Sequence, residues 1–281
     1  YRQRLTNQAE SQLEMLRRLE LSADMHRMLI EYCSKAGIGF LSTPFDEESL
    51  ELLIDFGIDM IKIPSGEITN YPFLETVARS GLPVLLSTGM ATLAEVGEAL
   101  EWLDVSGNPS VTLLHCVTEY PAPFAEINLR AMHTMRSAFD LPVGYSDHSA
   151  GIEIAIAAVA IGASVIEKHF TLDRSMPGPD HQASLEPDEL KTMVRAIRHV
   201  EVALGDGRKA PALCEQKNIP IARKGLIAAK SLSAGEVVGR EAIAIKRPSG
   251  GIEPRDISKV AGLRVTRPVL EDTPLTWDMF K

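Results

Sequence analysis

Two histidines, His148 and His169, end two short apolar segments that are separated by a stretch rich in alanine and isoleucine. Residues 143–148 and 164–169 have the pattern of strands, and residues 151–162 have apolar side chains on nearly every side of a helix. A strand, a crossover helix and a second strand make a parallel unit whose strands end on the same side. We therefore expect both imidazoles at neighbouring strand ends, where they could share a metal ion.

An alternative interpretation is two unrelated histidines, one at a helix cap and one in the core, because so short a motif is only a hypothesis. If His148 and His169 do act together, no obvious carboxylate ligand accompanies them. Most of the coordination would then fall to water and substrate, which describes an open site that polarises an oxygen. Imidazole ligands favour manganese, iron, cobalt or zinc over magnesium.

Two polar clusters follow earlier apolar segments. Lys62 and Ser65 lie in Ile61-Lys-Ile-Pro-Ser-Gly-Glu67, and Ser87 begins Ser87-Thr-Gly89 one predicted strand later. An ammonium, hydroxyls and backbone amides at adjacent strand ends suit a phosphate group. The alternatives are a solvated lysine beside a simple Ser-Gly turn, or a Schiff base on Lys62 as in a barrel aldolase. The aldolase chemistry would leave the histidine pair unnecessary.

A long loop rich in hydrogen-bonding groups, residues 174–184, follows the strand that ends at His169. It could be a solvated surface turn. As a loop at the carboxyl end of a strand, however, it is better placed to hold a polyhydroxylated substrate.

The elements that must position these residues alternate along the chain. Strands are predicted at residues 38–43, 59–64, 83–87, 111–117, 143–148 and 164–169. Helical patterns cover residues 5–36 (ending at Gly37), 46–56 (with Asp46 as N-cap), 70–79, 92–103, 129–138, 151–162 and 186–204. Such alternation is typical of a (β/α) barrel or a doubly wound sheet.

We favour the barrel because every predicted strand ends in a polar cluster, whereas a doubly wound sheet would gather such residues at one switch point. A closed barrel needs eight strands and six are predicted, so we expect the first two to precede Tyr1. Residues 1–204 form the predicted barrel domain, and residues 205–221, rich in glycine, proline and charge, a linker. Residues 222–281 are predicted to be a small mixed domain, marginal alone.

Composition narrows the possible partners and compartment. A formal net charge of -9 gives no basic footprint, which argues against nucleic acid as a partner. Three cysteines without a CxxC pair favour a cytoplasmic protein without disulfides. No apolar run is long enough to span a membrane and no signal peptide is evident, so we expect no membrane partner.

Several motifs occur in one order along the chain: Lys62-Ile-Pro-Ser-Gly-Glu67, Leu86-Ser-Thr-Gly-Met90, Gly144-Tyr-Ser-Asp-His148, Glu167-Lys-His-Phe170, Pro177-Gly-Pro-Asp180 and Lys246-Arg247-Pro. Together they resemble the sialic acid synthase (N-acetylneuraminate synthase) family, whose members end in an antifreeze-like (SAF) domain. The resemblance implies a (β/α)8 TIM barrel followed by a small β-rich antifreeze-like domain. The family's opening strands, which carry a glutamate and a further lysine of the site, have no counterpart in this chain.

The resemblance also implies a reaction. Phosphoenolpyruvate would condense with an N-acetylated hexosamine, such as N-acetylmannosamine, to give phosphate and a nine-carbon 2-keto sugar acid of the sialic acid type. Alternatives are a synthase for a related acid such as legionaminic acid, or a carbohydrate-binding relative without catalysis. The implied cofactor is a divalent metal, manganese first, with magnesium or cobalt as alternatives.

By the same resemblance, each motif residue has an implied role. The metal ligands are His148 and His169, and the catalytic residues are Glu67, beside the reacting carbons, and Lys62. Phosphoenolpyruvate is implied to contact Lys62, Ser65, Ser87 and Ser146, and the substrates are further implied to contact Thr118, Tyr120 and Asp180. Some members have Asn where Thr118 stands. Arg247 is implied to reach the partner subunit's site in a domain-swapped homodimer.

Overall fold

The computed structural model describes residues 12–106, 110–178 and 180–281. The chain divides into two compact units, Tyr1–Asp206 and Gly207–Lys281, which are described separately below. The predicted helical residues 5–11 lie outside the described residues. Within the described ranges, no helix is both long and apolar enough to cross a membrane.

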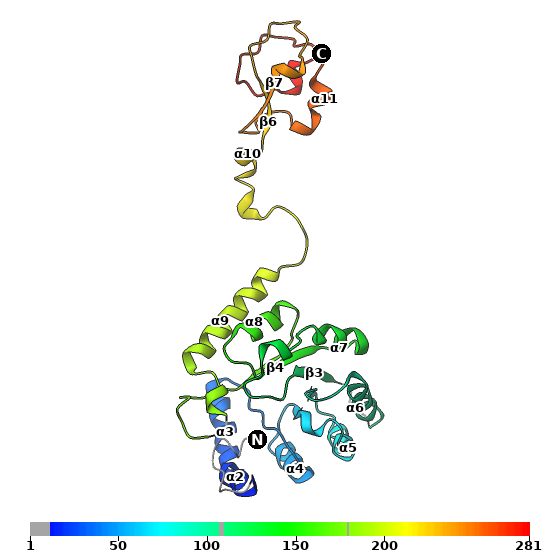
Figure 1. Cartoon of the computed structure of the whole chain (residues 1–281), viewed down its shortest axis with the longest axis vertical. Helices are drawn as coiled ribbons and strands as arrows, with labels where there is room; N and C mark the ends of the chain where they lie inside the picture. Colours follow the sequence, from blue (N-terminus) through cyan, green and yellow to red (C-terminus); the bar gives the residue numbers. More distant parts are fainter. Residues whose placement is uncertain (1–11, 107–109, 179) are drawn as a thin grey trace. The chain divides into compact units, whose positions relative to one another are not determined.

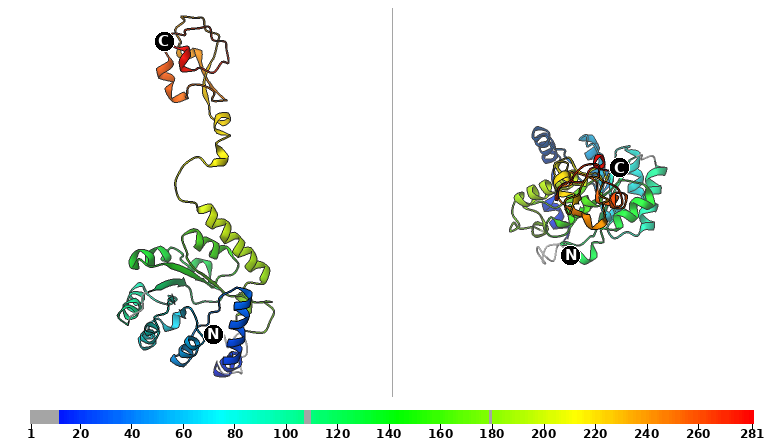
Figure 2. Two further views of the ribbon diagram at one scale, coloured as in Figure 1. Left: turned by 180° about the vertical axis from the view of Figure 1, so that it is seen from behind. Right: turned by 90° about the horizontal axis from the view of Figure 1, so that it is seen from above.

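The first unit is built on a five-stranded parallel sheet whose strands follow one another in chain order. The strands are β1 (Ile61–Ile63), β2 (Val84–Ser87), β3 (Val111–Cys116), β4 (Val143–Asp147) and β5 (Ile166–Lys168). Parallel neighbours need crossover connections, and a helix lies between each consecutive pair. Figures 1 and 2 show these helices along the outside of a curled sheet. The predicted β/α architecture is confirmed as a half-barrel.

The helices of this unit agree with their predicted positions. In chain order they are α2 (Gln12–Leu19), α3 (Ala23–Ala36), α4 (Glu47–Asp55), α5 (Tyr71–Arg79), α6 (Leu93–Val105), α7 (Ala131–Phe139), α8 (Glu153–Ala160) and α9 (Pro187–Leu204). Two predicted caps are confirmed. Gly37 ends α3 at φ 70°, a conformation that glycine adopts without strain. The Asp46 side chain accepts a hydrogen bond from the Ser49 amide at 2.7 Å and so begins α4.

The predicted strand at residues 38–43 is wrong. In the described part of the chain the sheet begins at β1, and residues 38–43 form no ladder with it. Ile38 is 65% exposed and Leu41 is 41% exposed, so two of the apolar side chains that indicated a strand are largely uncovered. An extended segment becomes part of a sheet only where an adjacent strand supplies hydrogen-bond partners. The described sheet therefore has five strands, and it does not close into an eight-stranded barrel.

The two faces of the sheet differ in chemistry because side chains alternate along each strand. Ile61 and Ile63 of β1 and Tyr145 of β4 belong to the main apolar core, which packs against the outer helices. Lys62 and Ser146 lie between or beside them in sequence and therefore point to the opposite, concave face. The concave face thus receives Lys62 and Ser146.

The second unit contains a two-stranded antiparallel sheet, β6 (Gly225–Ala228) with β7 (Ile243–Lys246). Its own core contains Leu226, Val238 and Leu275. The expected small β-containing domain is thus present. Within the predicted linker, the chain forms a short 3-10 turn, Leu213–Glu215, and most of the helix α10 (Ile219–Ala222).

Gly144 allows the chain entering β5 to approach β4 closely, and we expect this close approach to contribute to the stability of the fold. A Cβ at this position would lie 2.6 Å from the Val165 carbonyl oxygen and 2.7 Å from Leu114 Cδ2. Because a backbone oxygen cannot move aside cheaply, Gly144→Ala should lower the free energy of unfolding by about 1–3 kcal/mol in urea denaturation. Gly39→Ala is the control, since a Cβ there meets nothing within 4 Å. Equal free energies of unfolding for the two variants would contradict the prediction.

Candidate functional site

A chain of polar contacts crosses the concave face from the first strand to the last. Lys62 Nζ donates to both carboxylate oxygens of Glu167, at 2.9 and 3.1 Å. Ser146 Oγ donates to Glu167 Oε2 at 2.5 Å, and it lies 3.5 Å from His148 Nε2. Glu167 therefore connects two of the predicted phosphoenolpyruvate contacts, Lys62 and Ser146, and leads to a predicted metal ligand.

The Glu167 carboxylate is held in its charged form by its neighbours. Burial alone would raise its pKa, but the Lys62 charge and the hydrogen bonds from Ser146 and Lys62 outweigh burial and lower the pKa below its usual value. The Lys62 side chain is only 8% exposed, whereas that of Glu167 is 41% exposed. The lysine side chain of the pair is therefore enclosed, and the glutamate side chain is partly accessible to solvent.

The orientation of His148 leaves one ring nitrogen available as a ligand. His148 Nδ1 lies 2.7 Å from the Val117 carbonyl oxygen, which can only accept, so Nδ1 carries the proton. Burial lowers the pKa of His148, and the nearby His169 lowers it further, against the effect of the Val117 carbonyl. A neutral imidazole with its Nδ1 proton fixed by a carbonyl is the form in which Nε2 binds a metal.

Tyr120 and Asp180 meet the two histidines. The His148 and His169 rings lie 5.4 Å apart between centroids, at 79° to one another. The Tyr120 ring is 4.1 Å from that of His148 and 5.3 Å from that of His169. Asp180 Oδ2 lies 3.9 Å from His169 Nδ1. Two predicted metal ligands and two predicted substrate contacts are thus brought together.

These residues fit the implied metal. Two neighbouring imidazoles, one with its Nε2 unprotonated, supply nitrogen donors of the kind that manganese or cobalt accepts. Among the described residues, no group of three or more His, Cys, Asp or Glu is arranged to hold a metal. The described residues thus offer the two imidazoles as nitrogen donors, the arrangement of an open site.

A second group of polar side chains surrounds Gly89, just after β2. The Gly89 amide donates to Ser65 Oγ at 3.0 Å, and Ser65 Oγ lies 3.1 Å from Cys116 Sγ. A Cβ on Gly89 would lie 2.4 Å from Thr118 Oγ1. Ser87, at the end of β2, is buried, and its hydroxyl has no hydrogen-bond partner among the described residues. A buried hydroxyl of this kind is available to a ligand.

Glu67 lies outside these contacts as far as the described residues show, and Arg247 belongs to the second unit. Glu67 ends a 3-10 turn after β1 and accepts a hydrogen bond of 2.6 Å from Asn70 Nδ2. Arg247 is exposed in the second unit, directly after β7.

Sequence reasoning missed Glu167 as a site residue. Its spacing in the sequence could have found it. Glu167 stands two residues before His169, so both side chains point to the same face of the sheet. It is also the register partner of Ser146 across β4 and β5. The next residue, Lys168, faces the helices and forms a buried ion pair of 2.8 Å with Asp147.

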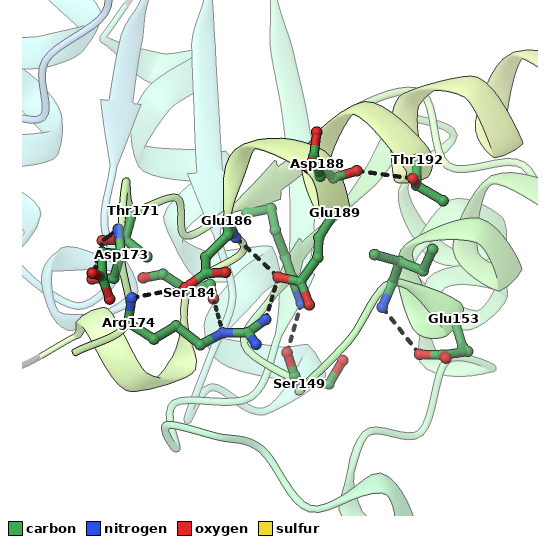
Figure 3. A network of polar contacts seen from close by, with 12 residues as sticks. Ser149, Glu153, Thr171, Asp173, Arg174, Ser184, Glu186, Asp188, Glu189 and Thr192 are labelled. Carbon is green, nitrogen blue, oxygen red and sulfur yellow. Dashed lines mark hydrogen bonds and ion pairs between the residues drawn. The ribbon is translucent and has the colours of Figure 1, made fainter.

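The loop that carries Asp180 is fixed to α9 (Figure 3). Arg174 donates through its amide to Glu186 Oε1 at 3.0 Å and through Nε to the Ser184 carbonyl at 2.9 Å. Its guanidinium also pairs with Glu189 in the first turn of the helix. These contacts hold both ends of the loop, so Asp180 is presented from an anchored segment.

Comparison with known proteins identifies the family of each part of the chain. Residues 1–209 match the NeuB family, and residues 223–281 match the SAF domain. The chain is 50% identical over 274 residues to the N,N'-diacetyllegionaminic acid synthase of Campylobacter jejuni, covering 97% of this chain and 82% of that protein. It is 36% identical over 262 residues to human N-acetylneuraminate-9-phosphate synthase, covering 92% and 72%.

A solved structure shares the fold. The N-acetylneuraminic acid synthetase of Leptospira borgpetersenii, in complex with citrate, superposes with a TM-score of 0.71 at 38% identity. The match covers 78% of this chain and 76% of that one. By sequence and by fold, this chain belongs to the NeuB family of sialic-acid-type synthases and carries a SAF domain at its C-terminal end.

Proposed function

We propose that this enzyme condenses phosphoenolpyruvate with an N-acetylated hexosamine to give a nine-carbon 2-keto sugar acid and phosphate. The observation that carries the proposal is the meeting of a buried ammonium, two imidazoles, a tyrosine and an aspartate on one concave face. Two sugars are candidates. N-acetylmannosamine would give sialic acid itself, and the similarity to a C. jejuni synthase favours the diacetamido precursor of N,N'-diacetyllegionaminic acid.

In this proposal, the residues of the chain divide the work of orientation. Lys62 and Ser146 hold the phosphate and carboxylate of phosphoenolpyruvate, with Ser65 and the buried Ser87 hydroxyl as further donors. Tyr120 and Asp180 orient the sugar. Fixing both substrates makes the encounter effectively unimolecular, which is where such a site gains most of its rate.

The bond changes follow from the substrates. The enol carbon of phosphoenolpyruvate attacks the sugar aldehyde carbon: a C–C bond forms, the C=C and C=O π bonds break, C2 becomes cationic, and the aldehyde oxygen takes up a proton. Water then adds to C2 and loses a proton, and the resulting hydroxyl loses its own proton as the C2–O bond breaks, which leaves the ketone and phosphate with the bridging oxygen. Glu67 is the carboxylate proposed to accept the proton of that water, and its hydrogen bond from Asn70 fixes its orientation. A divalent metal held by His148 and His169, manganese first, would supply Lewis-acid polarisation of the aldehyde oxygen when bound.

The test of the function is phosphate release from phosphoenolpyruvate with each candidate sugar in turn. Lys62→Ala should raise the Michaelis constant for phosphoenolpyruvate by at least about tenfold, because a charge-assisted contact to the anion is lost. The constant for the sugar should change much less. Lys35→Ala, a change at an exposed helix residue, is the control.

Two results would overturn the role of Lys62. Equal effects of Lys62→Ala on both Michaelis constants would exclude a specific contact between Lys62 and phosphoenolpyruvate. A borohydride-reducible adduct at Lys62 would instead indicate Schiff-base chemistry.

The metal proposal has its own readout. His148→Ala should weaken manganese binding by at least about a hundredfold, measured by titration calorimetry. Mutating a residue that only hydrogen-bonds to a metal ligand can already lower metal affinity this much, and removing the ligand itself should lower it no less. His133→Ala, at an exposed position on α7, serves as the control and should bind manganese as the wild type does. Unchanged manganese affinity in the His148 variant would rule out this site.

Arg247 is proposed to complete the sugar site of a partner subunit in a homodimer. Arg247→Ala should raise the Michaelis constant for the sugar and leave that for phosphoenolpyruvate unchanged. A mixed dimer of one Arg247→Ala subunit and one His148→Ala subunit would contain one site with both residues. Activity near half that of the wild type is therefore expected in purified mixed dimers. Activity no higher than that of the Arg247→Ala dimer would refute the exchange.

A further inference from the structure

The proposed anion site at Lys62 is occupied by a carboxylate of the protein, that of Glu167. Both oxygens of the Glu167 carboxylate lie within 3.1 Å of Lys62 Nζ. The same carboxylate accepts the hydrogen bond of Ser146. Two groups proposed to bind phosphoenolpyruvate are therefore both engaged by one glutamate.

A purely structural ion pair is also present in this sheet, and it looks different. Asp147 and Lys168 lie on the helix side with side chains 0% and 4% exposed, and Lys168 also donates to the Ser149 carbonyl at 2.6 Å. No solvent-accessible side remains there. In the Lys62–Glu167 pair, by contrast, only the lysine side chain is enclosed, and the Glu167 side chain is 41% exposed.

This asymmetry determines what can be exchanged. A buried ammonium needs a counter-charge, because an unpaired charge in the interior is strongly destabilising. The partly exposed Glu167 side chain can turn toward water, while the enclosed Lys62 side chain cannot. An incoming phosphate would therefore replace the carboxylate and leave the ammonium where it is.

We propose that Glu167 is a positioning residue that occupies the phosphate site at Lys62 and Ser146 in the absence of substrate and yields it to the phosphate of phosphoenolpyruvate. The inference rests on the proposed function, because it names the group with which that substrate competes. Glu167 keeps the ammonium directed into the concave face, and its competition weakens the hold on inorganic phosphate, the product.

The test measures binding of inorganic phosphate and of phosphoenolpyruvate by titration calorimetry, without turnover. Glu167→Gln keeps the side-chain shape and removes the competing charge, so both anions should bind about threefold to tenfold tighter than to the wild type. Glu167→Asp keeps the charge with a shorter reach and should give an intermediate affinity. This second variant also keeps the test decisive if Glu167→Gln does not fold.

A double variant distinguishes competition for Lys62 from a general loosening of the site. With Lys62→Gln in place, adding Glu167→Gln should not tighten phosphate binding further, because the contested ammonium is gone. Asp147→Asn breaks the ion pair on the helix side and should leave phosphate affinity unchanged. Each folded variant is recognised by a cooperative thermal transition.

The outcomes are distinct. Unchanged or weaker phosphate binding in both Glu167 variants, or equal tightening in Asp147→Asn, would overturn the inference. The proposed function would still stand if the wild type binds phosphoenolpyruvate and Lys62→Gln weakens that binding. Absence of phosphoenolpyruvate binding by the wild type would instead overturn the proposed substrate, and with it the inference.

Discussion

The ion pair between Lys62 and Glu167 links the two ends of the sheet, because β1 and β5 are its first and last strands. Residues 105 positions apart in the chain meet here only because the sheet curls. A buried lysine without this partner would be a large cost to the fold. The Lys62 ammonium therefore both holds the two ends of the sheet together and is the charge proposed to bind substrate.

Strands β4 and β5 each contribute to both faces through consecutive residues. Ser146 and Glu167 point to the concave face, whereas Asp147 and Lys168 point toward the helices. Each strand thus connects a site residue directly to a residue fixed in the interior. A shift of one residue in the register of a strand would turn its site residue toward the helices and its interior residue toward the concave face. The strand register therefore has to be fixed for the site to form.

Local patterns predicted much of this arrangement. The strand ends at His148 and His169, the caps at Gly37 and Asp46, and the crossover helices all follow from short-range apolar periodicity and capping chemistry. The segment at residues 38–43 was mispredicted because pairing, which periodicity does not reveal, decides whether an extended segment joins a sheet. Glu167 escaped notice for a similar reason, since its partner Lys62 is distant in the chain.

The anchoring of the Asp180 loop has a consequence for how substrate preference can diverge. Arg174, Glu186 and Glu189 fix this loop to α9, whereas Lys62, Ser146 and Glu167 stand on strands. Substitutions within the loop therefore leave the strand-borne groups in place. Given the proposed contact of Asp180 with the sugar, residues 175–183 are the natural target for a library of altered sugar specificity that leaves the strand residues unchanged.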